Sequence, residues 1–361
     1  MNKLDKKLDD PLNELTLPSF SKALNINHHS CTQASMPDGP MIFRYGVLTQ
    51  EQRRMIPGNA NMASGVVVGD AIQWHYSNKI WKHNPTTKKL APVDNEKLSK
   101  EVAIQKAIEK FNEYQPIDDK DRDKFEHYKE TIPQTIREGF KAIDSLGISK
   151  SKLVVAEDSI SKQDERLELP IVGRTDLHFK IQSEDFNAAE QSASASVSNT
   201  APFLSVLELK TVWQKPGKIK KDGSRSFSAA RLPLFPSKVH LQQISFYTVS
   251  LSRFSPVPYL IYLSADGFRI FNVKNCGDLE PANIKNYYEQ LVQICQRRER
   301  LFKRYAHFND RDRILEEIIA DTDPQFDHPF YWNIGHEFLT HAKELWSNRK
   351  WLLLHSSLTQ Q

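Results

Sequence analysis

Two short stretches of the chain carry residues whose types and spacing could perform chemistry: 173–179 (GRTDLHF) and 207–211 (LELKT). Each alternates apolar and polar residues, which predicts a strand with one buried face. In the second stretch this alternation places Glu208 and Lys210 on one face and the leucines on the other. If the strand carrying Asp176 pairs beside it, Asp176 and Glu208 can share a divalent cation. Carboxylates bind hard metals, and a metal activates both a phosphate and a bound water, so the pattern suits phosphodiester hydrolysis.

The Glu-x-Lys pattern also has an ordinary explanation. One face of many antiparallel strands is solvated, and Glu and Lys are mostly exposed in folded proteins. Taken alone, Glu208 and Lys210 therefore also fit a solvated strand face. Other motifs in a consistent order are needed to favour a catalytic role.

Four short motifs follow one another along the chain: 153–157 (LVVAE), 173–176 (GRTD), 207–211 (LELKT) and 243–247 (QISFY). In this order they resemble the PD-(D/E)xK nuclease superfamily, and within it the RecB-like branch that includes phage exonucleases and the mitochondrial genome maintenance exonuclease. In that branch a G-x-x-D strand precedes a (D/E)-x-K-T strand, and a Q-x-x-x-Y helix follows. The resemblance covers roughly residues 65–247.

The resemblance implies a metal site and a catalytic lysine. Asp176 and Glu208, helped by the backbone carbonyl of Leu209, would bind Mg²⁺ or Mn²⁺. Lys210 would position or deprotonate the attacking water. Glu157 stands where the family often carries another acidic residue near the metal, although an exposed strand carboxylate explains it equally well.

The resemblance also implies residues that contact DNA. Gln243 and Tyr247 are four residues apart and fall on the same face of the predicted helix. In the family this pair lines the active-site groove, so both would orient the DNA strand.

The family's first motif is a small-residue turn followed by a helix that carries His or Glu, and it falls at residues 63–75 (ASGVVVGDAIQWH). Alignment on Gly65 puts Gly69 at the usual histidine. Alignment on Gly69 puts Gln73 there, with His75 two residues further along. Gln73 and His75 are therefore both candidates, and the apolar and aromatic residues of the segment also fit an ordinary core helix.

A basic segment, residues 214–238, follows the predicted catalytic strand. It contains seven Lys and Arg residues and one Asp, whereas the whole chain carries a net charge of only +4. A flexible basic loop at this point is well placed to bind phosphates, and a solvated surface loop is the alternative. The residues predicted to contact DNA here are Lys215, Lys218, Lys220, Lys221 and Arg225.

Composition excludes several classes of protein. No apolar run approaches the roughly 20 residues that span a bilayer, and residues 1–10 do not form a secretory signal. We therefore expect a soluble, cytoplasmic protein without a membrane partner, in the host cytoplasm if the chain is phage-encoded. The three cysteines lie far apart without a C-x-x-C pair, which indicates neither zinc nor disulfides. They are too few for the four-cysteine iron–sulfur cluster of some RecB-like nucleases.

Periodicity and length predict a chain of helices and strands with a sizeable core, an α/β fold. The resemblance implies their arrangement, which is a mixed central β-sheet flanked by helices in a restriction-endonuclease-like core. We expect an N-terminal extension over 1–48, wrapped on the core or partly mobile, the nuclease core over 49–305, and a C-terminal helical region over 306–361 packed on it. The expected helices are 49–83 (broken near Pro57), 94–113, 122–146, 240–252, 283–302 and 311–319. The expected strands are 153–160, 170–181, 203–212, 259–264 and 267–273, with a mobile loop over 183–202.

The function that these observations favour is a Mg²⁺-dependent DNA exonuclease. The exonuclease mode, a phage origin, and a role in DNA replication, recombination or host DNA breakdown follow only from the resemblance, as do replication or recombination proteins as partners. The alternatives are a structure-specific or restriction-type endonuclease and a non-catalytic DNA-binding protein on a nuclease fold. The intact Asp176, Glu208 and Lys210 argue against the last. The sequence does not indicate an oligomeric state.

Overall fold

The computed structural model describes residues 18–83, 90–148, 151, 153–181, 203–221, 225–308, 310–328 and 331–358. Contacts group these residues into two compact units, each built from several segments of the chain. The first unit comprises 59–160 and 173–288, and the second comprises 18–58, 161–172 and 289–358. The contiguous boundaries expected from the sequence remain predictions, and the loop expected over 183–202 lies outside the described residues.

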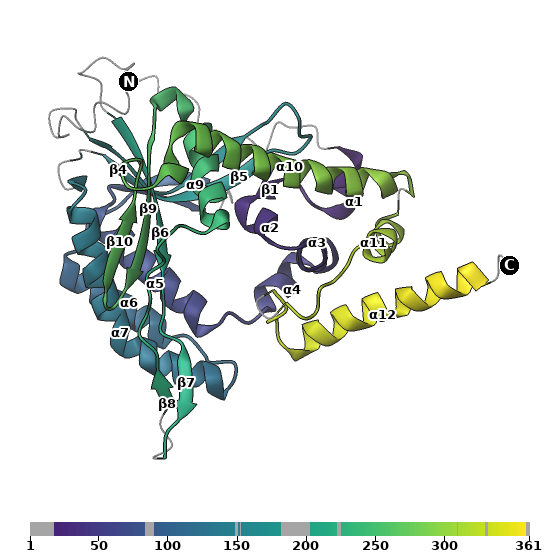
Figure 1. Ribbon diagram of the computed structural model, residues 1–361, viewed down its shortest axis with the longest axis horizontal. Coiled ribbons are helices and arrows are strands. Elements are labelled where there is room, and N and C mark those ends of the chain that lie inside the picture. Colours follow the sequence, from purple (N-terminus) through teal and green to yellow (C-terminus); the bar gives the residue numbers. More distant parts are fainter. Residues whose placement is uncertain are drawn as a thin grey trace. The chain divides into compact units, whose positions relative to one another are not determined.

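The chain forms a mixed eight-stranded sheet, in the order β10-β9-β6-β5-β4-β2-β3 with β1 beside β5 (Figure 1). β6 runs antiparallel to β5 and parallel to β9. The strands are β1 (His29–Ser30), β2 (Lys79–His83), β3 (Leu90–Asp94), β4 (Val154–Lys162), β5 (Ile171–Ile181), β6 (Phe203–Thr211), β9 (Val257–Ser264) and β10 (Gly267–Phe271). The predicted α/β class with a mixed, helix-flanked sheet is confirmed.

Helices of the first unit pack on both faces of its sheet. α5 (Ala60–Tyr76), α6 (Lys100–Asn112) and α7 (Asp119–Asp144) share one core with the leucines of β5 and β6, among them Leu207 and Leu209. α9 (Lys238–Ser250) packs on β6 and β9. Because successive strand residues point to opposite faces, Glu208 and Lys210 lie on the α9 side, as the alternation predicts.

The helix predicted over 49–83 was wrong at its C-terminal end. α4 (Gln50–Met55) and α5 are separated near Pro57 as expected, but Lys79–His83 is strand β2. Ile80 is buried and pairs with Ala156 of β4 in a parallel register. Tertiary pairing, together with an aromatic and a β-branched residue in this segment, outweighs the helical pattern there.

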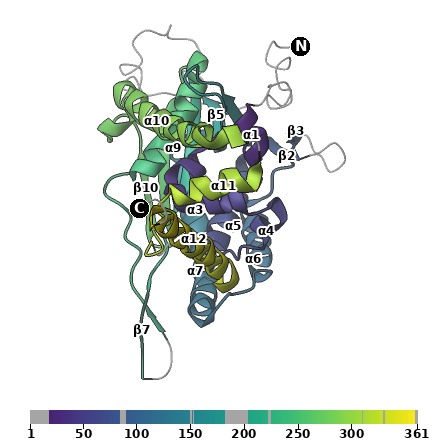
Figure 2. The same cartoon turned by 90° about the vertical axis from the view of Figure 1, so that its right-hand side faces the viewer.

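The basic segment contains a two-stranded hairpin, β7 (Pro216–Ile219) and β8 (Arg225–Phe227), which projects away from the sheet of its unit (Figure 1 and Figure 2). The His127 ring of α7 stacks on Phe227 with ring centroids 3.8 Å apart. Arg225 forms an ion pair with Asp123 of α7. The segment was predicted as a loop, and this was wrong for residues 216–219 and 225–227, which form paired strands that contact α7.

The second unit is largely helical. It contains α1 (Ser19–Leu24), α2 (Cys31–Ser35), α3 (Asp38–Ile42), a π-helical turn (Phe43–Val47), α4, the C-terminal part of α10 (Pro281–Tyr305), α11 (Arg311–Ala320) and α12 (His336–Leu358). Phe20 and Phe43 share its core with Trp332 and Trp346. Apolar residues from the segment before Leu48 are therefore part of this unit's core, where Trp332 and Trp346 also pack. The side chain of Trp351 lies outside the described ones.

Arg298, a buried arginine of the second unit, forms hydrogen bonds with the segment 33–38. Arg298 of α10 donates to Asp38 Oδ1 (2.9 Å) and to the carbonyl oxygens of Gln33 (2.7 Å) and Met36 (2.5 Å). These bonds satisfy a charged group that would be costly to bury alone. Across the described parts of the chain, no helix is both long and apolar enough to cross a membrane.

Candidate active site

The paired part of β5 and β6 ends just before the candidate carboxylates. The register runs from Ile181 opposite Phe203 to Leu177 opposite Leu207, and beyond it the Leu209 amide donates to Asp176 Oδ2 at 2.6 Å. The N–H and C=O of one strand residue project to the same side of the strand. The Leu209 carbonyl therefore lies on the Asp176 side as well.

A chain of hydrogen bonds connects the catalytic candidates to α9. Lys210 Nζ donates to Glu208 Oε1 (2.5 Å) and to Gln243 Oε1 (3.1 Å). Gln243 Nε2 donates to the Tyr247 hydroxyl (3.0 Å), which donates to the Arg174 carbonyl (2.5 Å). The structure thus brings Glu208 and Lys210 together with Gln243 and Tyr247. The Lys210 ammonium group is held by two hydrogen bonds, one to the Glu208 carboxylate and one to the Gln243 side-chain amide.

The glycine of the G-x-x-D motif allows α9 to approach β5. A Cβ atom at Gly173 would lie 2.8 Å from ring carbons of both Phe246 and Tyr247, closer than real contacts allow. Glycine at this position therefore lets the Tyr247 hydroxyl reach the strand backbone.

Glu157 sits at a strained point of β4. Its φ of 55° is in the left-handed region, which is uncommon for a residue other than glycine and costs free energy. Gln73 Nε2 of α5 donates to Glu157 Oε1 at 2.7 Å. His75 instead has its Nδ1 2.8 Å from the Leu98 carbonyl oxygen and packs against Phe140. Of the two first-motif candidates, the structure places Gln73 with the carboxylates and His75 away from them.

The two candidate metal-binding carboxyl groups, Asp176 and Glu208, are buried next to each other. Glu208 is only 2 % exposed, and within the described residues its Oε2 atom has no hydrogen-bond partner. Burial raises the pKa of Glu208, against the opposing effect of Lys210. Burial and the charge of Glu208 raise the pKa of Asp176 well above its usual range. Burial disfavours the charge on Lys210, but Glu208 and Asp176 offset this and leave its pKa raised.

The donor atoms fit a hard cation. Asp176, Glu208 and the Leu209 carbonyl offer oxygen ligands, which Mg²⁺ and Mn²⁺ prefer. The unpartnered Glu208 Oε2 is an acceptor that such an ion would satisfy. Glu157 is close enough for its charge to raise the pKa of both other carboxylates. In the part of the chain that is described, no three Asp, Glu, His or Cys side chains already converge as a metal-binding group.

Tyr262 and His240 lie near Lys210, and neither was identified as a site residue from the sequence. Tyr262 of β9 is the register partner of Lys210, and its hydroxyl lies 2.6 Å from His240 Nδ1 and accepts from the Ser237 amide at 3.2 Å. Burial, with a smaller effect of Lys210, lowers the pKa of His240 to about 4. Finding them requires the β6–β9 register, for which the sequence offers no signal.

The basic residues of the hairpin segment divide into two groups. Lys215, Lys218, Lys220 and Lys221 are exposed. Arg225, by contrast, is engaged by Asp123 and donates to the Gly217 carbonyl oxygen at 3.2 Å. The four lysines are thus available to an anionic ligand, whereas Arg225 fastens the hairpin.

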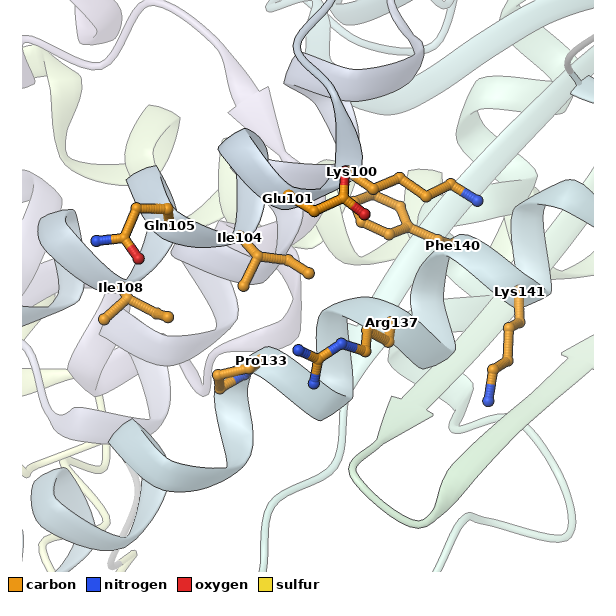
Figure 3. Close-up of a pocket in the computed structure, with 9 residues that line it drawn as sticks. All are labelled: Lys100, Glu101, Ile104, Gln105, Ile108, Pro133, Arg137, Phe140 and Lys141. Carbon is orange, nitrogen blue, oxygen red and sulfur yellow. The ribbon is translucent and has the colours of Figure 1, made fainter.

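A groove of about 580 Å³ lies elsewhere in the first unit, between α6 and α7 (Figure 3). Figure 3 shows apolar side chains from both helices and the charged ends of Lys100, Arg137 and Lys141 around it. None of the predicted site residues lines this groove.

No family model matches the chain, and neither a curated protein nor a solved structure matches it significantly.

Proposed function

We propose that the chain is a divalent-metal-dependent deoxyribonuclease. The observation that carries this proposal is the placement of Asp176 on β5 beside Glu208 and Lys210 on β6, with one oxygen of the buried Glu208 unpartnered. A buried carboxylate with an unsatisfied oxygen costs stability. Solvated strand residues would carry no such cost, so this burial supports a functional role over the ordinary explanation.

Asp176, Glu208 and the Leu209 carbonyl would hold Mg²⁺ or Mn²⁺, with Glu157 as a further carboxylate nearby. When bound, the metal supplies a Lewis acid that polarises the phosphate and lowers the pKa of a bound water. Lys210 points its ammonium group at Glu208 and is held there by Gln243. As an ammonium group it is positioned to orient the attacking water. Against the effect of burial, Glu208 and Asp176 raise its pKa, so taking the proton of that water would first require Lys210 to lose its own.

The residues around this centre support a polyanionic substrate. Tyr247 and Gln243 fix the lysine from α9, while the four exposed hairpin lysines offer phosphate contacts directly after β6. We propose DNA as the substrate and exonucleolytic removal of nucleotides as the mode, on the basis of the motif resemblance. A restriction-type or structure-specific endonuclease is the alternative that the first experiment must separate.

The test is incubation of the purified chain with end-labelled linear DNA and with covalently closed circular DNA, each with Mg²⁺ or with a chelator. We expect Mg²⁺-dependent loss of the linear DNA while closed circles survive, because a circle has no end. Cleavage of closed circles would support the endonuclease instead. Survival of both substrates in Mg²⁺ and in Mn²⁺ would overturn the nuclease proposal.

A further inference from the structure

Leu234 and Phe235, in the loop before α9, are the most exposed large apolar side chains of the described residues, at 71 % and 76 %. Keeping two such side chains in water forgoes the free energy of burying them. Adjacent exposed apolar residues commonly mark a binding surface. We call this pair the Leu–Phe platform.

The backbone on both sides of the platform is fastened to the sheet. Arg269 of β10 donates to the Pro233 carbonyl oxygen at 2.7 Å, and Pro236 is buried. Both prolines restrict their own φ angles. The Leu–Phe platform therefore projects from a fixed loop, which lowers the entropic cost of holding a ligand on it.

Ser237 and Tyr262 connect the platform to the strand position of the candidate catalytic lysine. The Ser237 amide donates to the hydroxyl of Tyr262, whose residue is the register partner of Lys210. Phe235 precedes Ser237 by two residues, so their Cα atoms are at most about 7 Å apart. A group stacked on Phe235 is therefore within reach of a chain that passes Lys210.

The charge around the platform favours an anionic ligand. Arg231 and Lys238 flank it and are exposed, and the sequence between Arg225 and Lys238 contains no Asp or Glu. A ligand that offers both a flat apolar face and negative charge is a nucleotide of an unpaired strand. Aromatic side chains bind such strands by base stacking, with little regard to sequence.

We propose that the Leu–Phe platform stacks on an unpaired DNA base next to the cleaved phosphate, which makes single-stranded DNA the substrate class. This inference rests on the proposed nuclease function and adds a specificity to it. Bases in a duplex are already stacked on one another, so an intact duplex would not offer its faces to Phe235. A second copy of this chain, docking through the same apolar residues, is the competing occupant.

The test is fluorescence anisotropy with the full chain in chelator, where no DNA is cleaved. The probes are a labelled oligothymidylate and an abasic strand of equal length, which keeps the phosphates and lacks the bases. The variants are Phe235→Ala, Phe235→Trp and, as a control of matched exposure, Met55→Ala (69 % exposed). Because both positions are exposed, the variants should fold, which circular dichroism checks.

We expect Phe235→Ala to weaken oligothymidylate binding roughly tenfold and to leave abasic-strand binding unchanged. Phe235→Trp and Met55→Ala should match the wild type. Equal losses on both strands, or no loss on either, would overturn the platform. So would light scattering that shows a wild-type dimer converted to a monomer by Phe235→Ala with DNA binding intact.

The same data separate this inference from the proposed function. A wild type that binds and cleaves DNA, together with a Phe235→Ala variant that behaves identically, would overturn only the platform. A wild type that binds neither strand and cleaves no DNA would overturn both.

Discussion

Gln73 and Glu157 are joined by a hydrogen bond of 2.7 Å between side-chain atoms Nε2 and Oε1, although 84 residues separate them in the chain. The bond links α5 to the one residue of β4 whose backbone is in the left-handed region. Strain of this kind persists only where surrounding contacts hold it, and it is common at functional sites. The pair therefore indicates that α5 contributes Gln73 to the site.

The two first-motif candidates should respond differently to truncation. Gln73→Ala should lower the cleavage rate roughly 10- to 100-fold, because a hydrogen bond to a charged group contributes about 1.5–3 kcal/mol. His75→Ala should lower the melting temperature instead, because His75 packs on Tyr76 and Phe140. Single-turnover rates and thermal melts of both variants check this. A slow His75→Ala enzyme beside a fast Gln73→Ala enzyme would reverse the assignment.

Lys210 should matter more for the chemical step than for DNA binding. Lys210→Ala should reduce the rate at saturating DNA by roughly 10²-fold or more, because the attacking water loses the group that orients it. Lys210→Arg should restore little of it, because a planar guanidinium does not match the compact ammonium group that donates to Glu208 and Gln243. A near-wild-type rate for Lys210→Arg would show that positive charge alone is needed.

The hairpin lysines should set the salt dependence of binding. Replacing Lys215, Lys218, Lys220 and Lys221 by serine should reduce the slope of log K against log salt by about 0.7 for each phosphate of a single strand that the protein no longer neutralises. The rate at saturating DNA should change little, because these lysines bind the ground and transition states equally.

A matched variant controls for overall charge. It replaces four exposed lysines of the first unit outside the hairpin, Lys97, Lys120, Lys129 and Lys285. Anisotropy titrations at several salt concentrations measure both slopes. Equal slopes for the two variants would mean that the hairpin is merely solvated surface.

His240 should make the protein acid-sensitive. Burial lowers its pKa to about 4 in the folded state, whereas the unfolded value is 6.5. Between these values the unfolded chain binds more protons, so the free energy of unfolding falls as pH falls. Going from pH about 7.5 to about 4.5 should cost the wild type about 2 kcal/mol more than His240→Gln. Urea unfolding at both pH values tests this; an identical pH dependence would contradict it.

The local patterns were predictable from the sequence because they depend on period alone. Alternation in β6 places Glu208 and Lys210 together, and a spacing of four places Gln243 and Tyr247 on one helix face. The positions that escaped prediction depend on long-range pairing. Tyr262 reaches Lys210 only through the β6–β9 register.

The same limit explains the two incorrect segments. The strand at Lys79–His83 is stabilised by pairing with β4, and the β7–β8 hairpin by stacking of His127 on Phe227. Neither partner is adjacent in the sequence, so local propensity could not reveal either contact. The packing of Phe20 and Phe43 into the second unit has the same origin, because their partners lie near the C-terminus.

The central claim is that Asp176 and Glu208 bind the metal that cleaves DNA. The most direct measurement is the Mg²⁺-dependent cleavage rate of linear DNA by Asp176→Asn and Glu208→Gln, with DNA binding measured in parallel. The control is Asp70→Asn, whose carboxylate pairs with Lys110 on α6 (2.5 Å). We predict a loss of roughly 10³-fold or more in both site variants, because metal stabilisation contributes several kcal/mol, with binding retained and the control unaffected. Normal cleavage by either site variant would contradict the claim.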